Sequence, residues 1–176
     1  MRRIVLFGIS VLSVLLMSFI LLNNSNKDCS NKYKSKEFKL SICMEPEWNA
    51  KISGSYLIIS KDKINITIYK SILKNEKSPK DIANEELEEE LNNNSFTGLE
   101  VVKKEAMKID GMDAYMITTH LPKIKSETGF QRETTFMTIY YIYKGFVFAI
   151  NNNCYSENCS ENQLMIRKVA ELIELK

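Results

Sequence analysis

The chain has 176 residues, with 24 Lys and Arg, 22 Asp and Glu, and a single His. Removing Arg2 and Arg3 from the 24 leaves 22 cations against 22 anions over residues 27–176. This balance argues against a nucleic-acid partner, because affinity for a phosphate backbone needs a surplus of cations on one face. One His cannot build a His-rich zinc site, and no metal or cofactor is expected.

The amino-terminal segment is the most informative part of the chain. Residues 4–22 are nineteen consecutive residues without a charge, and about 20 apolar residues in a helix cross the hydrocarbon core of a bilayer. Arg2 and Arg3 form the positive flank that stays in the cytoplasm, which places residues 27–176 outside. Signal peptides have shorter apolar regions and small residues at the cleavage site. A signal anchor within 1–22, held in the lipid bilayer, is therefore favoured over a cleaved signal peptide and a secreted product.

The first part of the outer region is predicted to be a linker followed by strands. Residues 23–36 are polar and show no apolar period, so they are interpreted as a polar linker. The folded domain is expected over residues 37–176. Alternating apolar residues predict a first strand at 38–44, and two further alternating runs at 56–60 and 64–70 are typical of a hairpin.

The strongest helix signal begins at Ser78. Ser78 can cap the helix, Pro79 suits the first helical position, and Asp81 completes a capping box. The apolar stripe is formed by Ile82, Ala83, Leu87 and Leu91. Five Glu residues within 85–90 occupy the other face. They are predicted to be solvated surface, because carboxylates that diverge around a helix do not converge on a cation.

The second half of the domain is predicted to be strand-rich and to end in a helix. Its elements are strands at 99–108, 113–120, 134–143 and 146–150, a polar connection at 122–131, and a helix from Ser160 to the end. Asp110-Gly111 and Lys144-Gly145 are predicted hairpin turns. Both faces of the last two strands are apolar, so each face needs a cover. The fold class is therefore α+β, an antiparallel sheet of about six to seven strands with helices on both faces, preceded by one transmembrane helix.

The four cysteines are Cys29, Cys43, Cys154 and Cys159. An even number outside the reducing cytosol permits disulfides, and three pairings are allowed. Sequence proximity favours Cys154 with Cys159 and Cys29 with Cys43. A metal pair is disfavoured, because the spacing is wider than C-x-x-C and no His is near.

No catalytic constellation is evident in the sequence. His120 is the only imidazole, and sequence alone cannot place Ser126 or Cys154 beside it as a nucleophile. An exposed or hydrogen-bonded His120 is therefore favoured over a catalytic one. The chain also lacks a glycine-rich phosphate loop and the G-x-S-x-G and H-E-x-x-H motifs.

The aromatic residues between 130 and 155 are interpreted first as core, because the strands that carry them are apolar on both faces. If any of them contacts a partner, Tyr141 and Tyr143 near the hairpin end are the better candidates. His120 is the third speculative contact residue.

Two stretches of the domain resemble a known family. FKLSICMEPEW resembles the opening signature of PsbP-like domains and their Mog-type relatives, and IDGMDAYMI resembles their strand-turn-strand. The likeness covers residues 37–176 and implies an α/β/α sandwich on an antiparallel sheet. PsbP-like domains are mostly accessory or binding modules, and their bacterial forms are secreted or membrane-anchored. The resemblance transfers no catalytic residue, and the anchor and four cysteines depart from the family pattern.

These observations favour a non-enzymatic, membrane-anchored extracytoplasmic domain that engages a protein partner at the cell envelope. Two alternatives stay open. One is a small-ligand carrier, which requires a concave apolar pocket. The other is a hydrolase that uses His120.

Overall fold

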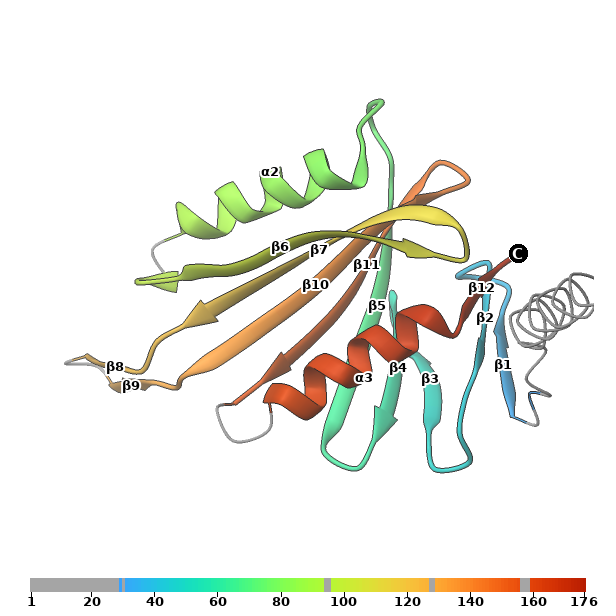
Figure 1. Cartoon of the computed structure of the whole chain (residues 1–176), viewed down its shortest axis with the longest axis horizontal. Coiled ribbons are helices and arrows are strands. Elements are labelled where there is room, and N and C mark those ends of the chain that lie inside the picture. The colour runs from blue at the N-terminus through green and yellow to red at the C-terminus, as the bar shows by residue number, and fades with distance from the viewer. Residues whose placement is uncertain (1–28, 30, 94–95, 127–128, 156–158) are drawn as a thin grey trace, which may run out of the picture. The chain divides into compact units, whose positions relative to one another are not determined.

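A seven-stranded antiparallel sheet forms the framework of the domain (Figure 1). Its strands are β3 (Asn49–Ser53), β4 (Tyr56–Lys61), β5 (Ile64–Ile72), β6 (Glu100–Ile109), β7 (Met112–Leu121), β10 (Thr134–Tyr143) and β11 (Phe146–Cys154). They lie in the order β3-β4-β5-β11-β10-β7-β6. The expected sheet of six to seven antiparallel strands is therefore confirmed.

The computed structural model describes residues 29, 31–93, 96–126, 129–155 and 159–176. Asn31–Lys176 is one compact unit. The expected membrane segment at 4–22 lies outside the described residues. Among the helices within the described ranges, none combines the length and apolar character needed to cross a membrane.

Tight turns join the long strands in the two places predicted from the sequence. Asp110 and Gly111 have φ of 47° and 80° between β6 and β7, and Lys144 and Gly145 have φ of 49° and 76° between β10 and β11. Two successive positive φ angles match the twist of a two-residue hairpin, and glycine adopts them without a steric cost. Both hairpin predictions are confirmed.

Helix α2 (Pro79–Leu91) covers one face of the sheet. The backbone N–H of Asp81 donates to Ser78 Oγ over 3.2 Å, and the backbone N–H of Ser78 donates to Asp81 Oδ2 over 3.0 Å. This reciprocal pair is the predicted capping box. The helix packs through Ile82, Ala83 and Leu87 on Ile117, Tyr140, Val147 and Ala149 of the sheet.

Helix α3 (Cys159–Glu171) covers the opposite face, as Figure 1 shows. The larger core lies beneath it and includes Phe38, Trp48, Met137, Tyr141, Phe148, Ile166 and Val169. A second sheet of three short strands closes one end of this core: β1 (Lys32–Ser35), β2 (Leu40–Cys43) and β12 (Ile173–Leu175), in the order β1-β2-β12. Helices on both faces of the main sheet were expected, and the structure confirms them.

Three expectations about the ends of the domain are corrected. Residues 32–35 form β1, although they fall inside the stretch expected to be a polar linker at 23–36. The last helix ends at Glu171, and Ile173–Leu175 continue as β12, which pairs with β2. The strand expected at 38–44 belongs to this small sheet and not to the main one.

The connection at 122–131 contains a short hairpin of β8 (Ile124–Ser126) and β9 (Gly129–Gln131).

A disulfide joins Cys154 at the end of β11 to Cys159 at the start of α3. This is the pairing that sequence proximity favoured. Cys29 and Cys43 are disulfide-bonded as well, so no described cysteine carries a free thiol. Bridged cysteines are typical of proteins that fold outside the reducing cytosol.

Candidate functional site: the cleft between α2 and the sheet

Of the two tyrosines proposed as contact residues, one is in the core. Tyr141 is fully buried and stacks on Phe148, so it is not available to a partner and that expectation is corrected. Tyr143 is half-buried, and Lys144 Nζ lies 5.0 Å from the centroid of its ring. Tyr143 thus remains at the surface next to the β10–β11 turn.

His120 lies between a threonine hydroxyl and a carboxylate, and neither Ser126 nor Cys154 is shown beside it as the expected nucleophile. Its Nδ1 lies 3.3 Å from Thr135 Oγ1, and its Nε2 lies 3.7 Å from Glu133 Oε1. Cys154 is engaged in its disulfide, and the side chain of Ser126 lies outside the described part of the chain. The hydrolase alternative therefore gains no support from this region.

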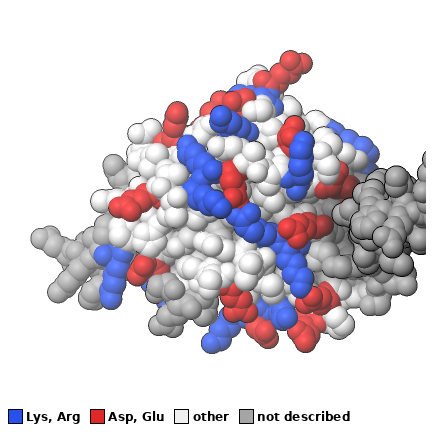
Figure 2. Space-filling view, in the orientation of Figure 1, with Lys and Arg blue, Asp and Glu red and all other residues white. Residues whose placement is uncertain are grey.

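Charged side chains are mixed on the surface. Figure 2 shows Lys and Arg interspersed with Asp and Glu across one face of the domain. Ion pairs connect distant segments there, such as Arg167 with Glu105 and Lys61 with Glu47. On this face a diagonal row of Lys and Arg is flanked by Asp and Glu, in keeping with the balanced charge of the domain.

A cleft of about 570 Å³ opens between the amino-terminal half of α2 and the sheet. We call it the α2–sheet cleft. From β5 and the segment after it, the cleft is lined by Tyr69, Ser71, Ile72, Leu73, Lys74, Asn75 and Lys77. The helix contributes Ile82, Glu85 and Glu86, and the central strands contribute Tyr140 and Val147. Its volume lies within the range of about 300–1,000 Å³ that is usual for ligand-binding pockets.

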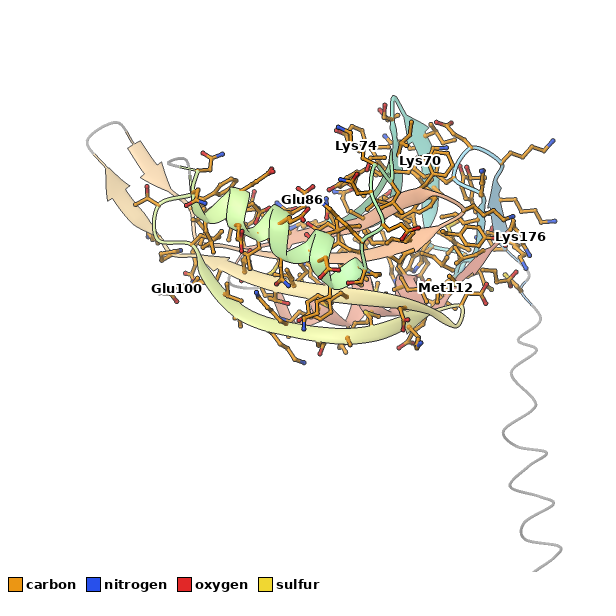
Figure 3. The ribbon with its side chains drawn as sticks, turned by 90° about the horizontal axis from the view of Figure 1, so that it is seen from above. Lys70, Lys74, Glu86, Glu100, Met112 and Lys176 are labelled. Atoms are coloured by element: carbon orange, nitrogen blue, oxygen red, sulfur yellow. A yellow bond between two sulfur atoms is a disulfide. The ribbon has the colours of Figure 1, made fainter. Side chains whose placement is uncertain are left out.

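The cleft has an apolar floor and a charged rim. Ile82, Tyr140 and Val147 are buried at its base. At the rim, Lys77 is paired with Glu85, whereas Glu86 makes no hydrogen bond or ion pair with any side chain in the described ranges. Figure 3 shows Glu86 on α2 and Lys74 just beyond the end of β5.

Two carboxylates on α2, the exposed Glu86 and the half-buried Glu90, have raised pKa values, and neither forms an ion pair within the described ranges. Burial raises the pKa of the Glu86 carboxyl, and the negative charges of Glu89 and Glu85 raise it further. Burial likewise raises the pKa of Glu90, one helical turn later, and Glu86 adds to that effect. Glu86 and Glu90 are four positions apart and thus lie on the same side of the helix. An incoming cation would therefore be attracted to this side.

Two tyrosines face these carboxylates across the cleft. Burial raises the pKa of Tyr69 and of Tyr140, and the charge of Glu86 contributes to both shifts. Both hydroxyls consequently stay neutral, and both tyrosines line the cleft together with Glu86. Aromatic faces together with carboxylates are the groups that bind a Lys or Arg side chain or another organic cation.

The arrangement does not resemble a metal centre. No group of three or more His, Cys, Asp or Glu residues is placed to hold a metal ion anywhere in the described part of the chain. What the cleft can do chemically is bind: an apolar floor takes aliphatic or aromatic groups, and the Glu86 side of the rim takes a positive charge.

Sequence reasoning did not identify this cleft. It treated the acidic run of α2 as solvated surface, which fits the exposed Glu85, Glu86, Glu88 and Glu89 but not the half-buried Glu90. The available signal was positional: Glu86 and Glu90 flank the apolar Leu87 and so border the buried stripe of the helix.

The fold and the cleft together define an α+β domain of the PsbP/Mog-like type, with two helices on antiparallel sheets of seven and three strands. No protein-family model and no curated protein sequence matches the chain. The likeness is seen in solved structures.

Three solved structures share this fold. The cyanobacterial PsbP protein (CyanoP) of Synechocystis sp. PCC 6803 has a TM-score of 0.57 at 12% identity, covering 83% of this chain and 92% of that one. The Ran-binding protein Mog1p of Saccharomyces cerevisiae has a TM-score of 0.54 at 9% identity, covering 82% and 94%. LpqN of Mycobacterium tuberculosis, involved in cell envelope biogenesis, has a TM-score of 0.53 at 15% identity, covering 78% and 83%. At these identities the likeness establishes the fold, and the expected PsbP-like architecture is confirmed.

Proposed function

We propose that this protein is a non-enzymatic binding module of the cell envelope, held in the membrane by residues 4–22, which recognises a basic side chain of a protein partner in the α2–sheet cleft. The main supporting observation is Glu86, which lines the cleft together with Tyr69 and Tyr140, has a raised pKa, and makes no ion pair within the described ranges. A Lys or Arg of the partner would supply that missing charge, and its aliphatic stem would pack on the apolar floor.

Three further observations support this proposal. The bridged cysteines fit a compartment outside the cytosol. Mog1p, which shares the fold, is a Ran-binding protein, and LpqN is involved in cell envelope biogenesis. Ile72, at the rim of the cleft, is 71% exposed, and an exposed aliphatic residue beside a charged groove is suited to a protein contact.

Site-specific photo-cross-linking in the native membrane tests the proposal. A photoreactive residue replaces Ile72 at the cleft, and a matched control replaces Leu164, which is 70% exposed on α3 at the opposite face of the sheet. We expect one stoichiometric envelope protein to be cross-linked from position 72 and not from position 164. Cross-linking of the same proteins from both positions would contradict a binding site in the cleft.

A charge variant distinguishes specific recognition in the cleft from non-specific electrostatic attraction. Glu86→Gln keeps the shape of the rim and removes its charge, so the yield of the cross-linked partner should fall. Glu88→Gln removes a charge from the same helix outside the cleft lining and should leave the yield unchanged. Equal losses in both variants would indicate a response to net charge alone.

A small-ligand carrier is the second candidate, and the volume of the cleft favours it. Native mass spectrometry of the full chain, released from its membrane in mild detergent, separates the two. A bound organic amine that is lost in Glu86→Gln would support the carrier, whereas an empty cleft together with a cross-linked protein would support the binding module.

A further inference from the structure

A second cavity lies beside the small sheet, where the described part of the domain begins. This cavity of about 470 Å³ is formed around β1, the β1–β2 turn and the end of β12. Five lysines line it: Lys32, Lys34, Lys36, Lys39 and Lys176. We call it the lysine pocket. Figure 3 shows Lys176 and Glu100 at opposite ends of the domain, so the pocket is remote from the start of β6.

The acids around the lysine pocket do not neutralise it. Glu174 pairs with Lys32 and Lys176. No ion pair with a described residue involves Lys34 or Lys36, and Lys39 lies over the ring of Phe146 with its Nζ 4.6 Å from the centroid. Three cations of the pocket are therefore without an anionic partner within the described ranges.

The pocket already stabilises negative charge. Hydrogen bonds from Lys32 and Lys176 lower the pKa of the Glu174 carboxyl to about 2. A neighbouring group, Lys144 Nζ, donates to the backbone oxygen of Lys176 over 2.7 Å. Lysine ammonium groups that border one cavity are suited to phosphate oxygens, which they bind as point charges.

The lysine pocket is close in the sequence to the expected membrane segment, and membranes carry phosphate groups in their lipid headgroups. Nine residues, 23–31, separate the expected membrane segment from Lys32. Fully extended, they reach roughly 30 Å at most. Where a leaflet contains anionic lipids, lysines held near its surface are attracted to the headgroups, and the attraction falls off within a Debye length.

From this placement we infer that the lysine pocket docks the domain on its own membrane by binding the phosphates of anionic phospholipids. The inference rests on the membrane attachment given under the proposed function, but it concerns a different surface from the α2–sheet cleft. Docking would fix the orientation of the domain and leave the cleft, on the far side of the main sheet from α3, to meet a partner.

Lysine footprinting of the full chain in vesicles tests the inference. The protein is inserted into vesicles of phosphatidylcholine alone or of phosphatidylcholine with phosphatidylglycerol, and the acetylation rate of each lysine is measured by mass spectrometry. We expect Lys34, Lys36 and Lys39 to react more slowly on the anionic vesicles, and Lys103 and Lys104 of β6 to react equally on both. High salt should abolish the protection, since it screens charges beyond a few ångströms.

Paired variants show whether the pocket is responsible. Each lysine that contacts an anionic surface favours the docked state roughly fivefold, so Lys34→Gln with Lys36→Gln should remove most of the protection of Lys39. The control pair, Lys103→Gln with Lys104→Gln, should leave the protection of Lys39 unchanged. Equal loss in both pairs would contradict docking through the pocket.

Three other outcomes of the vesicle experiment would contradict docking through the lysine pocket. Equal acetylation on both kinds of vesicle overturns the inference and leaves the cleft untouched. Protection by inorganic phosphate on uncharged vesicles would assign the pocket to a free anion and overturn the docking. Failure of the chain to float with either vesicle would overturn the anchor, and with it both the membrane attachment and the docking.

Discussion

The ring of Tyr141 lies on the ring of Phe148 with their centroids 4.8 Å apart and their planes 7° from parallel. Tyr141 is on β10 and Phe148 on β11, and the two residues are direct partners in the register of these strands. Both side chains are fully buried beneath α3. The contact therefore packs the middle of the sheet against the larger core, and it leaves the Tyr141 hydroxyl without a hydrogen-bond partner among the described residues.

Tyr141→Phe should increase the stability of the domain. The buried hydroxyl contributes no hydrogen bond within the described part of the chain, and burying an unpaired polar group costs about 1–3 kcal/mol. Removing it keeps the stacked ring, so we expect the free energy of unfolding to rise by up to about 1 kcal/mol. Urea denaturation followed by circular dichroism measures this. A clear loss of stability would show that the hydroxyl has a partner.

Glu86→Gln should stabilise the domain at neutral pH while weakening partner binding. The folded-state pKa of Glu86 is raised, so the folded protein holds this proton more strongly than the unfolded chain does. Stability is then lost as pH rises from the ordinary value of 4.5 through the raised value. Because Glu86 is largely exposed, the gain in the variant is only a few tenths of a kcal/mol, about the size of surface electrostatic effects.

The pH dependence provides the control for Glu86→Gln. Below the ordinary pKa, both the folded and the unfolded parent are protonated, so the parent and the variant should unfold at the same temperature. Above the raised pKa, the variant should unfold at the higher temperature. Thermal unfolding from acidic to neutral pH would count against desolvation of Glu86 if the two proteins coincided throughout.

The disulfide between Cys154 and Cys159 should contribute to stability through the unfolded state. The two cysteines are five positions apart, and closing so short a loop removes chain entropy worth about 2 kcal/mol in the loop-closure description. Cys154→Ser with Cys159→Ser should lower the free energy of unfolding by about that amount. Calorimetry of the oxidised parent and the double variant measures the difference. Adding reductant to the double variant tells whether the disulfide-bonded Cys29 and Cys43 contribute separately.

Ser78→Ala should destabilise α2 and the wall of the cleft that it forms. The substitution removes the Ser78 Oγ that accepts from the backbone N–H of Asp81, and loss of such an N-cap costs about 1 kcal/mol. Amide hydrogen exchange over residues 80–84 should accelerate. Lys80→Ala, an exposed change in the same turn, should leave exchange at its parental rate. Acceleration in both variants would mean that the first turn depends on Lys80 and not on the cap.

The elements predicted correctly are those whose signals are local. The capping box at Ser78 and the Asp110-Gly111 turn are each specified by a few neighbouring residues. Apolar residues on both faces of β10 and β11 indicate that both faces are buried, even when the elements that bury them are not known. β12 was missed because its partner strand β2 is far from it in the sequence. Ile173 pairs with Ile42, and no local pattern reports a contact over such a separation.

The candidate site was harder to predict for a related reason. The α2–sheet cleft combines residues of β5, α2, β10 and β11, so it exists only after the helix has packed on the sheet. The sequence shows that Glu86 and Glu90 are acidic. It does not show that they are desolvated, because their desolvation is set by neighbours that are remote in the chain.

The pairing of β12 with β2 has a consequence for biosynthesis. β2 leaves the ribosome early, but it cannot complete its sheet until Ile173–Leu175 have been made. This end of the domain therefore stays incomplete until synthesis has passed β12. Any chaperone that attends the nascent protein would find its binding surface along Leu40–Cys43, the strand whose final neighbour arrives last.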